Sequence, residues 1–235
     1  MSEKYDRYQS VDAPIPEESW AWNMYGAGVE NIGRDGKPEK VPVLQPGADQ
    51  LLVRVDAVGM CYSDVKLIRQ GGGHPKLYNR DLAQNPTRLG HEATHTVMKV
   101  GEALRDQFHP GQRLALQPDI YQDGKSTAYG YTIPGGLIQF HLIGPEVLDA
   151  DAGLYVIPVE GNIGYAEAAL TEPWACVEAA YTQRRRLTPK FGGTMWIVGH
   201  ADDLRAYEFS WGLDAPSSVV VTDIPESLPE HVREE

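Results

Sequence analysis

The stretch QLLVRVDAVGMCYSD, residues 50–64, joins an alternating apolar pattern to a group of reactive side chains. Apolar and polar residues alternate over its first part and the pattern ends at Gly59, which predicts a half-buried β-strand. Cys61, Ser63 and Asp64 follow directly. The strand therefore brings side chains of metal-ligand type to its carboxyl end.

The same alternation, punctuated by Gly and Pro, recurs further along the chain. Short strands are expected at residues 94–100, 113–116, 137–143 and 153–159. Strands of this length and spacing favour a small closed β structure. The first 45 or so residues are rich in Pro, Glu and Gly, and we expect an extended segment there with room for one strand.

The periodicity changes after residue 163. Helices are expected at 164–170 and 174–185, followed by short apolar strands at 193–199 and 218–222. Asp202 and Asp203 can cap a helix between these strands that runs to Trp211. Strand, helix and strand in this order form a βαβ unit of a parallel sheet. We therefore expect one domain over residues 1–190 and an incomplete nucleotide-binding domain over residues 191–235.

Composition excludes several classes of protein. Of the 235 residues, 42% are hydrophobic and 23% are charged, which predicts a buried core rather than a disordered chain. The net charge of −12 argues against a nucleic-acid or anionic-membrane partner. Two cysteines exclude both a disulfide framework and a four-cysteine zinc lobe. No apolar signal or spanning segment is evident, so we expect a soluble, cytoplasmic protein.

Three separated segments carry possible metal ligands. They are Cys61 after the first strand, the pair His91 and Glu92 before the next, and Glu172 at a helix start with Cys176 one turn later. Catalytic zinc takes three protein ligands of thiolate, imidazole or carboxylate type and leaves one position open. Cys61, His91 and Glu172 supply such a set, and Glu92 could serve as an exchanging fourth ligand.

This ligand set predicts a particular chemistry. Bound zinc lowers the pKa of a water or an alcohol to about 7, which prepares the alcohol for loss of hydride. Ser63 could accept the alcohol proton and pass it on. Asp64 could hold the far nitrogen of His91, as carboxylates commonly do beside metal sites.

Together these segments resemble the medium-chain, zinc-dependent alcohol and polyol dehydrogenases. The matching segments are Cys61-Tyr62-Ser63-Asp64, Gly90-His91-Glu92, Gly111-Gln112-Arg113-Leu114 and Glu172-Pro173. Leu116-Gln117-Pro118, Tyr129-Gly130-Tyr131 and Gly135-Gly136 are most similar to the branch of sorbose-1-phosphate reductase and sorbitol dehydrogenase. The resemblance implies an α+β fold: a GroES-like β-barrel catalytic domain followed by the first βαβ unit of a truncated Rossmann-type domain.

The resemblance also implies a nicotinamide cofactor, NAD(H) or NADP(H), but the expected binding turn departs from the family pattern. Gly199 alone remains of the glycine-rich motif, and Asp202 and Asp203 stand where a pyrophosphate would meet the helix N-terminus. Asp223 suits a ribose hydroxyl and thus NAD. The family's cysteine-rich structural zinc lobe is missing between residues 119 and 127.

Each candidate residue also has a simpler explanation. Cys61 could be a small buried hydrophobe and His91 a histidine of the core. Glu172 could only cap its helix, in which case Cys176 could replace it as the ligand. Asp223 could be an ordinary turn residue.

Two functions follow from these patterns. The first is a zinc-dependent oxidoreductase that interconverts an alcohol, namely a polyol, sugar or sugar phosphate, with its carbonyl. The second is a truncated or degenerate relative that binds metal but has no dehydrogenase activity by itself or needs a complementing chain. A piece of a longer polypeptide is a further reading. An unfinished sheet leads us to expect self-association or a complementing partner.

Overall fold

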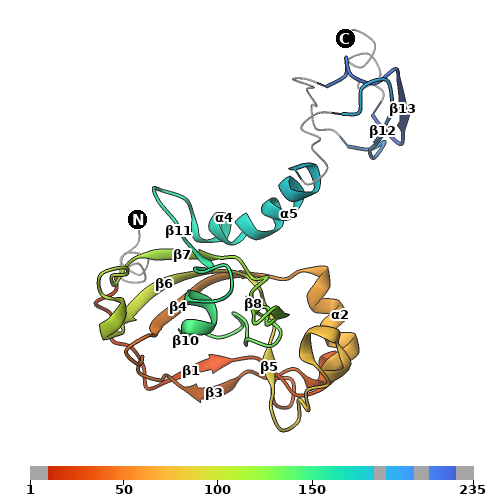
Figure 1. Ribbon diagram of the computed structural model, residues 1–235. Coiled ribbons are helices and arrows are strands. Elements are labelled where there is room, and N and C mark those ends of the chain that lie inside the picture. Colours follow the sequence, from red (N-terminus) through yellow and green to blue (C-terminus); the bar gives the residue numbers. More distant parts are fainter. Residues whose placement is uncertain (1–9, 183–188, 204–211, 226–235) are drawn as a thin grey trace. The chain divides into compact units, whose positions relative to one another are not determined.

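The computed structural model describes residues 10–182, 189–203 and 212–225. Its contacts divide the chain into two compact units, Met1–Trp174 and Ala175–Glu235. Each unit is described separately below. Figure 1 labels the helices and strands of both.

An antiparallel five-stranded sheet forms the centre of the described first unit. Its strands lie in the order β10-β4-β6-β7-β11. Their bounds are Leu51–Gly59 for β4, Glu92–Val100 for β6, Arg113–Leu116 for β7, Phe140–Ile143 for β10 and Val156–Pro158 for β11. Each falls within or close to a range expected from the alternating pattern.

The N-terminal segment contributes more strands than the single one expected. The described part contains β1 (Glu18–Ala21), β2 (Asn23–Met24) and β3 (Glu39–Pro42), of which β1 pairs with β3 and β2 pairs with β5 (Thr87–Arg88). These strands are short and interrupted by turns, so the local pattern does not predict them. Their partners, which lie far away in sequence, hold them in place.

The segment before β10 closes the barrel. The N–H of Gln139 donates to the carbonyl of Trp20 on β1 at 3.1 Å, and the carbonyl of Gln139 accepts the N–H of Val55 on β4 at 2.9 Å. In Figure 1 the pair β1–β3 accordingly lies across the core from β6 and β7. The closed β structure that the strand spacing predicts is confirmed.

The barrel interior is filled by apolar side chains from every strand of the central sheet. The main buried cluster contains Leu51, Val53, Ala93, Val97, Phe108, Leu114, Leu116, Ile120, Tyr129, Ile143, Val147, Tyr155 and Val156. A second cluster lies under the first helix and contains Met24, Leu67, Leu77, Leu82, Leu89, Ala128 and Tyr131. The second cluster matters for function because Tyr131 also borders the candidate site.

The described residues also form helices, 3-10 turns and one short hairpin outside the central sheet. The helices are α2 (Tyr62–Gln70), α3 (Pro145–Leu148), α4 (Tyr165–Ala169) and α5 (Thr171–Thr182). The 3-10 turns are η1 (Val29–Asn31), η2 (Gly71–Gly73), η3 (Pro75–Leu77) and η4 (Glu102–Leu104). A short hairpin is formed by β8 (Tyr121–Gln122) and β9 (Lys125–Ser126). Helix α2 was not expected from the sequence. Helix α5 begins earlier than expected, and the final residues of the range predicted for it lie outside the described part. No helix of the described residues is both long and apolar enough to cross a membrane.

The second unit contains two parallel strands, β12 (Thr194–Val198) and β13 (Ser218–Thr222), paired from Thr194↔Ser218 to Val198↔Thr222. Both were expected. The helix expected between them falls largely on residues 204–211, outside the described residues. The domain limits of 1–190 and 191–235 stay predictions.

Candidate metal centre

The ends of β4 and β6 place three candidate ligands together. Gly59, the last residue of β4, pairs with Glu92, the first residue of β6. Cys61 follows two residues after Gly59 and forms the N-cap of α2, while His91 directly precedes Glu92. Ligand atoms of Cys61, His91 and Glu92 all lie within 4.8 Å of one another.

Those separations suit a small four-coordinate cation. With zinc–sulfur and zinc–nitrogen bonds of about 2.3 and 2.0 Å, neighbouring ligand atoms of a tetrahedron are about 3.5 Å apart. Modest side-chain rotation would therefore close the group around one ion. His91 and Glu92 are buried and Cys61 is half-buried, so solvent can approach the three ligand atoms from the side of Cys61.

Asp64 forms hydrogen bonds with both segments that carry candidate ligands, the one at Cys61 and the one at Gly90-His91. Its carboxylate accepts the backbone N–H of Cys61 at 2.8 Å, as in a capping box, and the backbone N–H of Gly90 at 3.2 Å. Gly90 has φ +88°, and a Cβ there would press on Val58, so glycine suits this turn. One buried carboxylate thus sets the position of Cys61 relative to His91.

The two nitrogens of His91 face different groups. Nδ1 lies 3.5 Å from the carboxylate of Asp64, an ion-pair distance, and has no hydrogen bond to any described residue. Nε2 lies 3.2 Å from the hydroxyl of Ser63. The arrangement places Asp64 behind the ring, where a carboxylate orients a metal-binding imidazole and leaves Nε2 for the ion.

Negative groups gather around this imidazole. Burial lowers the pKa of His91, but the nearby carboxylate of Asp64 outweighs burial and, with Cys61 and Glu172, raises the pKa to about 9. Burial raises the pKa of the Cys61 thiol, yet hydrogen bonds from Ser63 and His91 bring it below its usual value. Burial and the charge of Glu172 raise the pKa of Glu92. The pocket therefore favours a positive charge, which a divalent ion can supply in place of the proton.

Glu172 lies in the first turn of α5 and is half-buried. Its charge acts on both His91 and Glu92, but it is not a member of the group of ligand atoms that lie within 4.8 Å. Cys176 is exposed on the same helix. The choice between these two residues as a ligand stays a prediction.

The structure adds residues that the sequence argument did not place at the site. The ring of Tyr131 lies 5.9 Å from that of His91 and 5.1 Å from that of His74. Burial raises the pKa of Tyr131, and a hydrogen bond from Ser63 opposes this rise. Tyr131 is part of a motif of the resembling family, whereas nothing in the local sequence marks His74.

The two expected cofactor residues also come together, within the second unit. The N–H of Gly199 donates to the carbonyl of Thr222 at 3.1 Å, and a Cβ on Gly199 would lie 3.1 Å from the carbonyl oxygen of Asp223. Both follow the carboxyl ends of parallel strands, where open α/β sheets bind their ligands. The carboxylate of Asp223 fits a ribose diol, while the exposed Asp202 beside Gly199 fits a pyrophosphate poorly.

A comparison with known protein families identifies the family of this chain. Residues 47–180, more than half of the chain, match the alcohol dehydrogenase GroES-like domain. The chain belongs to the alcohol dehydrogenase GroES-like domain family. This membership confirms the resemblance and the expected α+β fold.

Curated relatives of this GroES-like protein include dehydrogenases of polyols and their phosphates. It is 30% identical over 192 residues to mannitol-1-phosphate 5-dehydrogenase of Aliivibrio fischeri, covering 76% of this chain and 44% of the relative. It is 35% identical over 224 residues to sorbitol dehydrogenase of Bombyx mori, covering 89% and 58%. For L-sorbose 1-phosphate reductase of Klebsiella pneumoniae the identity is 29%, covering 78% and 46%. The chain spans about half the length of these relatives.

Solved structures share the fold of this GroES-like protein. Galactitol-1-phosphate dehydrogenase from Escherichia coli matches with a TM-score of 0.53 and 18% identity, covering 77% of this chain and 48% of that one. Acetophenone reductase from Geotrichum candidum in complex with NAD matches with a TM-score of 0.55 and 21% identity, covering 94% and 62%. At these identities the similarity establishes the fold alone.

Proposed function

We propose that this chain carries the catalytic metal site of a zinc-dependent oxidoreductase that interconverts the alcohol of a polyol, sugar or sugar phosphate with a carbonyl, using a nicotinamide cofactor. The observation that carries the proposal is the convergence of Cys61, His91 and Glu92 within 4.8 Å. Membership of the alcohol dehydrogenase GroES-like domain family and the similarity to dehydrogenases of polyols and their phosphates support it.

The donors fit zinc better than a hard cation. A thiol with a lowered pKa and an imidazole held from behind by a carboxylate are typical zinc ligands, whereas magnesium and calcium prefer oxygen alone. Cys61, His91 and Glu172 would hold the ion, and Glu92 would exchange with the substrate at the fourth position. When bound, zinc supplies Lewis acidity that lowers the pKa of an alcohol.

Ser63 is placed to handle the proton of the substrate hydroxyl. It sits in the first turn of α2, half-buried, beside the His91 ring and the phenol of Tyr131. It can accept the substrate proton while donating its own hydroxyl proton onward, with Tyr131 as the next group. Tyr131 is buried, so the second proton acceptor would be shielded from bulk water.

The cofactor part of the proposal rests on Gly199 and Asp223. A bound nicotinamide supplies the acceptor for hydride. Asp223 would accept hydrogen bonds from a ribose diol, and Gly199 would let the backbone approach the dinucleotide. The same carboxylate would repel a 2′-phosphate, so we propose NAD in preference to NADP.

Metal analysis on the purified full chain tests the proposal. We expect about one zinc per chain, loss of zinc in Cys61→Ala, and NAD-dependent oxidation of a polyol by the zinc-loaded protein. A chain that holds no zinc, or a Cys61→Ala variant that keeps it, would overturn the ligand assignment.

A second candidate is a metal-binding domain that needs a complementing chain or a second copy. Apolar side chains of the second unit favour it: Trp196 and Val198 on β12 are 68% and 59% exposed, and Val220 on β13 is 46% exposed. Zinc binding without any effect of NAD on fluorescence would support this candidate. Sedimentation analysis would then show whether the chain associates with itself.

A further inference from the structure

A series of side chains leads outward from the metal centre to basic groups. The ring of Tyr131 lies near the rings of both His91 and His74. The Nζ atom of Lys76 lies 5.1 Å from the centroid of the same Tyr131 ring. A lysine and a second histidine therefore lie one aromatic ring away from a candidate zinc ligand.

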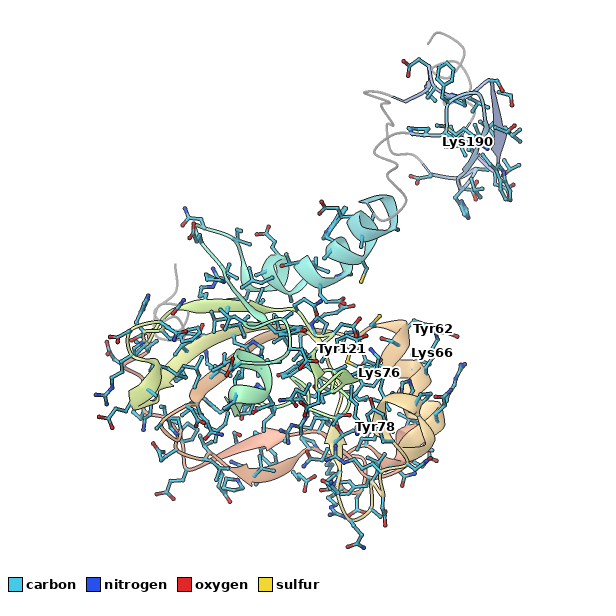
Figure 2. The ribbon with its side chains drawn as sticks, viewed as in Figure 1. Tyr62, Lys66, Lys76, Tyr78, Tyr121 and Lys190 are labelled. Atoms are coloured by element: carbon cyan, nitrogen blue, oxygen red, sulfur yellow. The ribbon has the colours of Figure 1, made fainter. Side chains whose placement is uncertain are left out.

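Helix α2 contributes a second lysine to this region. Lys66 follows Ser63 by three residues and so shares its face of the helix, and its Nζ lies 5.4 Å from the centroid of the Tyr62 ring. Burial lowers the pKa of His74 most, and the charges of Lys76 and Lys66 lower it further, so both lysines act electrostatically on the imidazole. Figure 2 shows Tyr62, Lys66 and Lys76 on the side of the barrel that carries helix α2.

One ring nitrogen of His74 is engaged by the backbone. The backbone N–H of Lys76 donates to its Nδ1 at 3.2 Å. A neutral imidazole that accepts at Nδ1 carries its proton at Nε2. The ring N–H of His74 and the ammonium groups of Lys66 and Lys76 are thus the donors that an anion would use, Lys76 after release from Asp119.

The segment that carries these groups is held in place. His74 is the N-cap of η3, with Pro75 at the first position, and the hydroxyl of Thr132 donates to the carbonyl of Lys76 at 2.6 Å. Lys76 also pairs with Asp119 at 2.6 Å, but this carboxylate is 58% exposed. Exposed ion pairs contribute little, so a dianion can displace Asp119.

We propose that His74, Lys66 and Lys76 bind the phosphate group of the substrate, which makes the substrate a phosphorylated polyol or sugar. The chain carries a net charge of −12, so a local group of two lysines stands out from the acidic remainder, and ammonium and imidazole N–H groups are the donors that phosphate prefers. The assignment of the substrate rests on the proposed function, but phosphate binding does not.

Calorimetric titration of the zinc-loaded full chain tests the inference. The ligands are sorbitol 6-phosphate, sorbitol and inorganic phosphate. We expect the ester to bind at least about tenfold more tightly than sorbitol, and Lys66→Gln combined with Lys76→Gln to remove that advantage. Lys99→Gln, which changes an exposed lysine bonded to Gln45 elsewhere on the barrel, should leave the affinity within about twofold.

Asp119→Asn provides a test of opposite sign. Removal of this carboxylate frees Lys76, so the ester should bind about two- to fivefold more tightly, which a purely structural role of Lys76 would not produce. Equal affinity for sorbitol and its phosphate, or an unchanged affinity in the double lysine variant, would overturn the inference.

Zinc-free Cys61→Ala separates this inference from the proposed function. If the variant still binds inorganic phosphate and loses that binding with the double lysine change, the phosphate site stands whether or not the protein is a zinc enzyme. If wild-type protein holds zinc and oxidises a polyol but binds no phosphate through the lysines, the function stands and the phosphate site is wrong.

Discussion

Gly59 faces the carboxylate of Glu92, and no larger residue fits between them. A Cβ at Gly59 would overlap the carboxylate oxygen of Glu92. We predict that Gly59→Ala displaces this carboxylate and weakens zinc binding by about tenfold while the barrel stays folded, because the displaced atom is the end of a side chain. Competition with a chromophoric chelator measures the affinity.

Gly73→Ala is the matched control. A Cβ at Gly73 would have no described atom within 4 Å, so zinc affinity should stay at the wild-type value. Equal affinities of the two variants would show that Glu92 does not contribute to the metal site.

Asp64 acts on the site through other residues. Its carboxylate lies behind His91 and accepts the N–H groups of Cys61 and Gly90. We predict that Asp64→Asn lowers zinc affinity by about 10- to 100-fold, because the amide carries no charge to orient and polarise the imidazole. An unchanged affinity, together with an unchanged pH dependence of zinc uptake, would contradict this role.

Sequence reasoning identified Cys61, His91 and Glu92 because the donors lie beside strands with a clear alternating pattern. It did not identify His74 or Tyr131 as site residues. Both lie outside regular strands and reach the site through ring contacts and backbone hydrogen bonds, which have no local signature. Residues placed by loops need the folded chain to be recognised.

Strands β6 and β10 bring a buried histidine, His95, and a half-buried one, His141, to the hydroxyl of Tyr129. His95 Nε2 lies 3.3 Å and His141 Nε2 lies 2.9 Å from the hydroxyl of Tyr129. Burial lowers the pKa of His95 to about 4, and burial with the charges of His95 and Arg88 lowers that of His141. Both rings are therefore neutral in the folded protein near neutral pH.

This network predicts how stability depends on pH. An unfolded histidine takes up a proton below pH ~6.5, while folded His95 stays neutral until about 4, so stability is lost as the pH falls through this window. For His95 the loss reaches about 3 kcal/mol in the free energy of unfolding. Urea denaturation at pH 7 and pH 4.5 measures it.

His95→Gln should flatten that dependence, because glutamine can still bond to Tyr129 but does not titrate. His109→Gln, at an exposed turn, should not flatten it. Equal slopes for wild type and His95→Gln would show that His95 charges in the folded state.

At the scale of elements, prediction succeeded where apolar alternation was long enough to set a face. Strands β4, β6, β12 and β13 belong to this class. Strands β1 and β3 follow proline-rich and glycine-rich turns and gain their order from pairing with each other. Helix α2 was not predicted because Cys61, Ser63 and Asp64 at its start were interpreted only as site residues. The capping box between Cys61 and Asp64 shows where the helix begins.

At the scale of the whole molecule, the donor residues all belong to the first unit. Cys61, His91, Glu92 and Glu172 precede its end at Trp174. We predict that residues 1–182 alone bind zinc with the affinity of the full chain, measured by metal analysis and chelator competition. Loss of zinc from this fragment would show that residues beyond 182 are needed for the site.

X-ray absorption at the zinc edge of the full chain tests the central claim most directly. We predict about one zinc per chain with a single sulfur ligand at about 2.3 Å and nitrogen and oxygen ligands at about 2.0 Å, and the sulfur signal should vanish in Cys61→Ser. A chain without bound zinc, or a metal with two sulfur ligands or none, would contradict it.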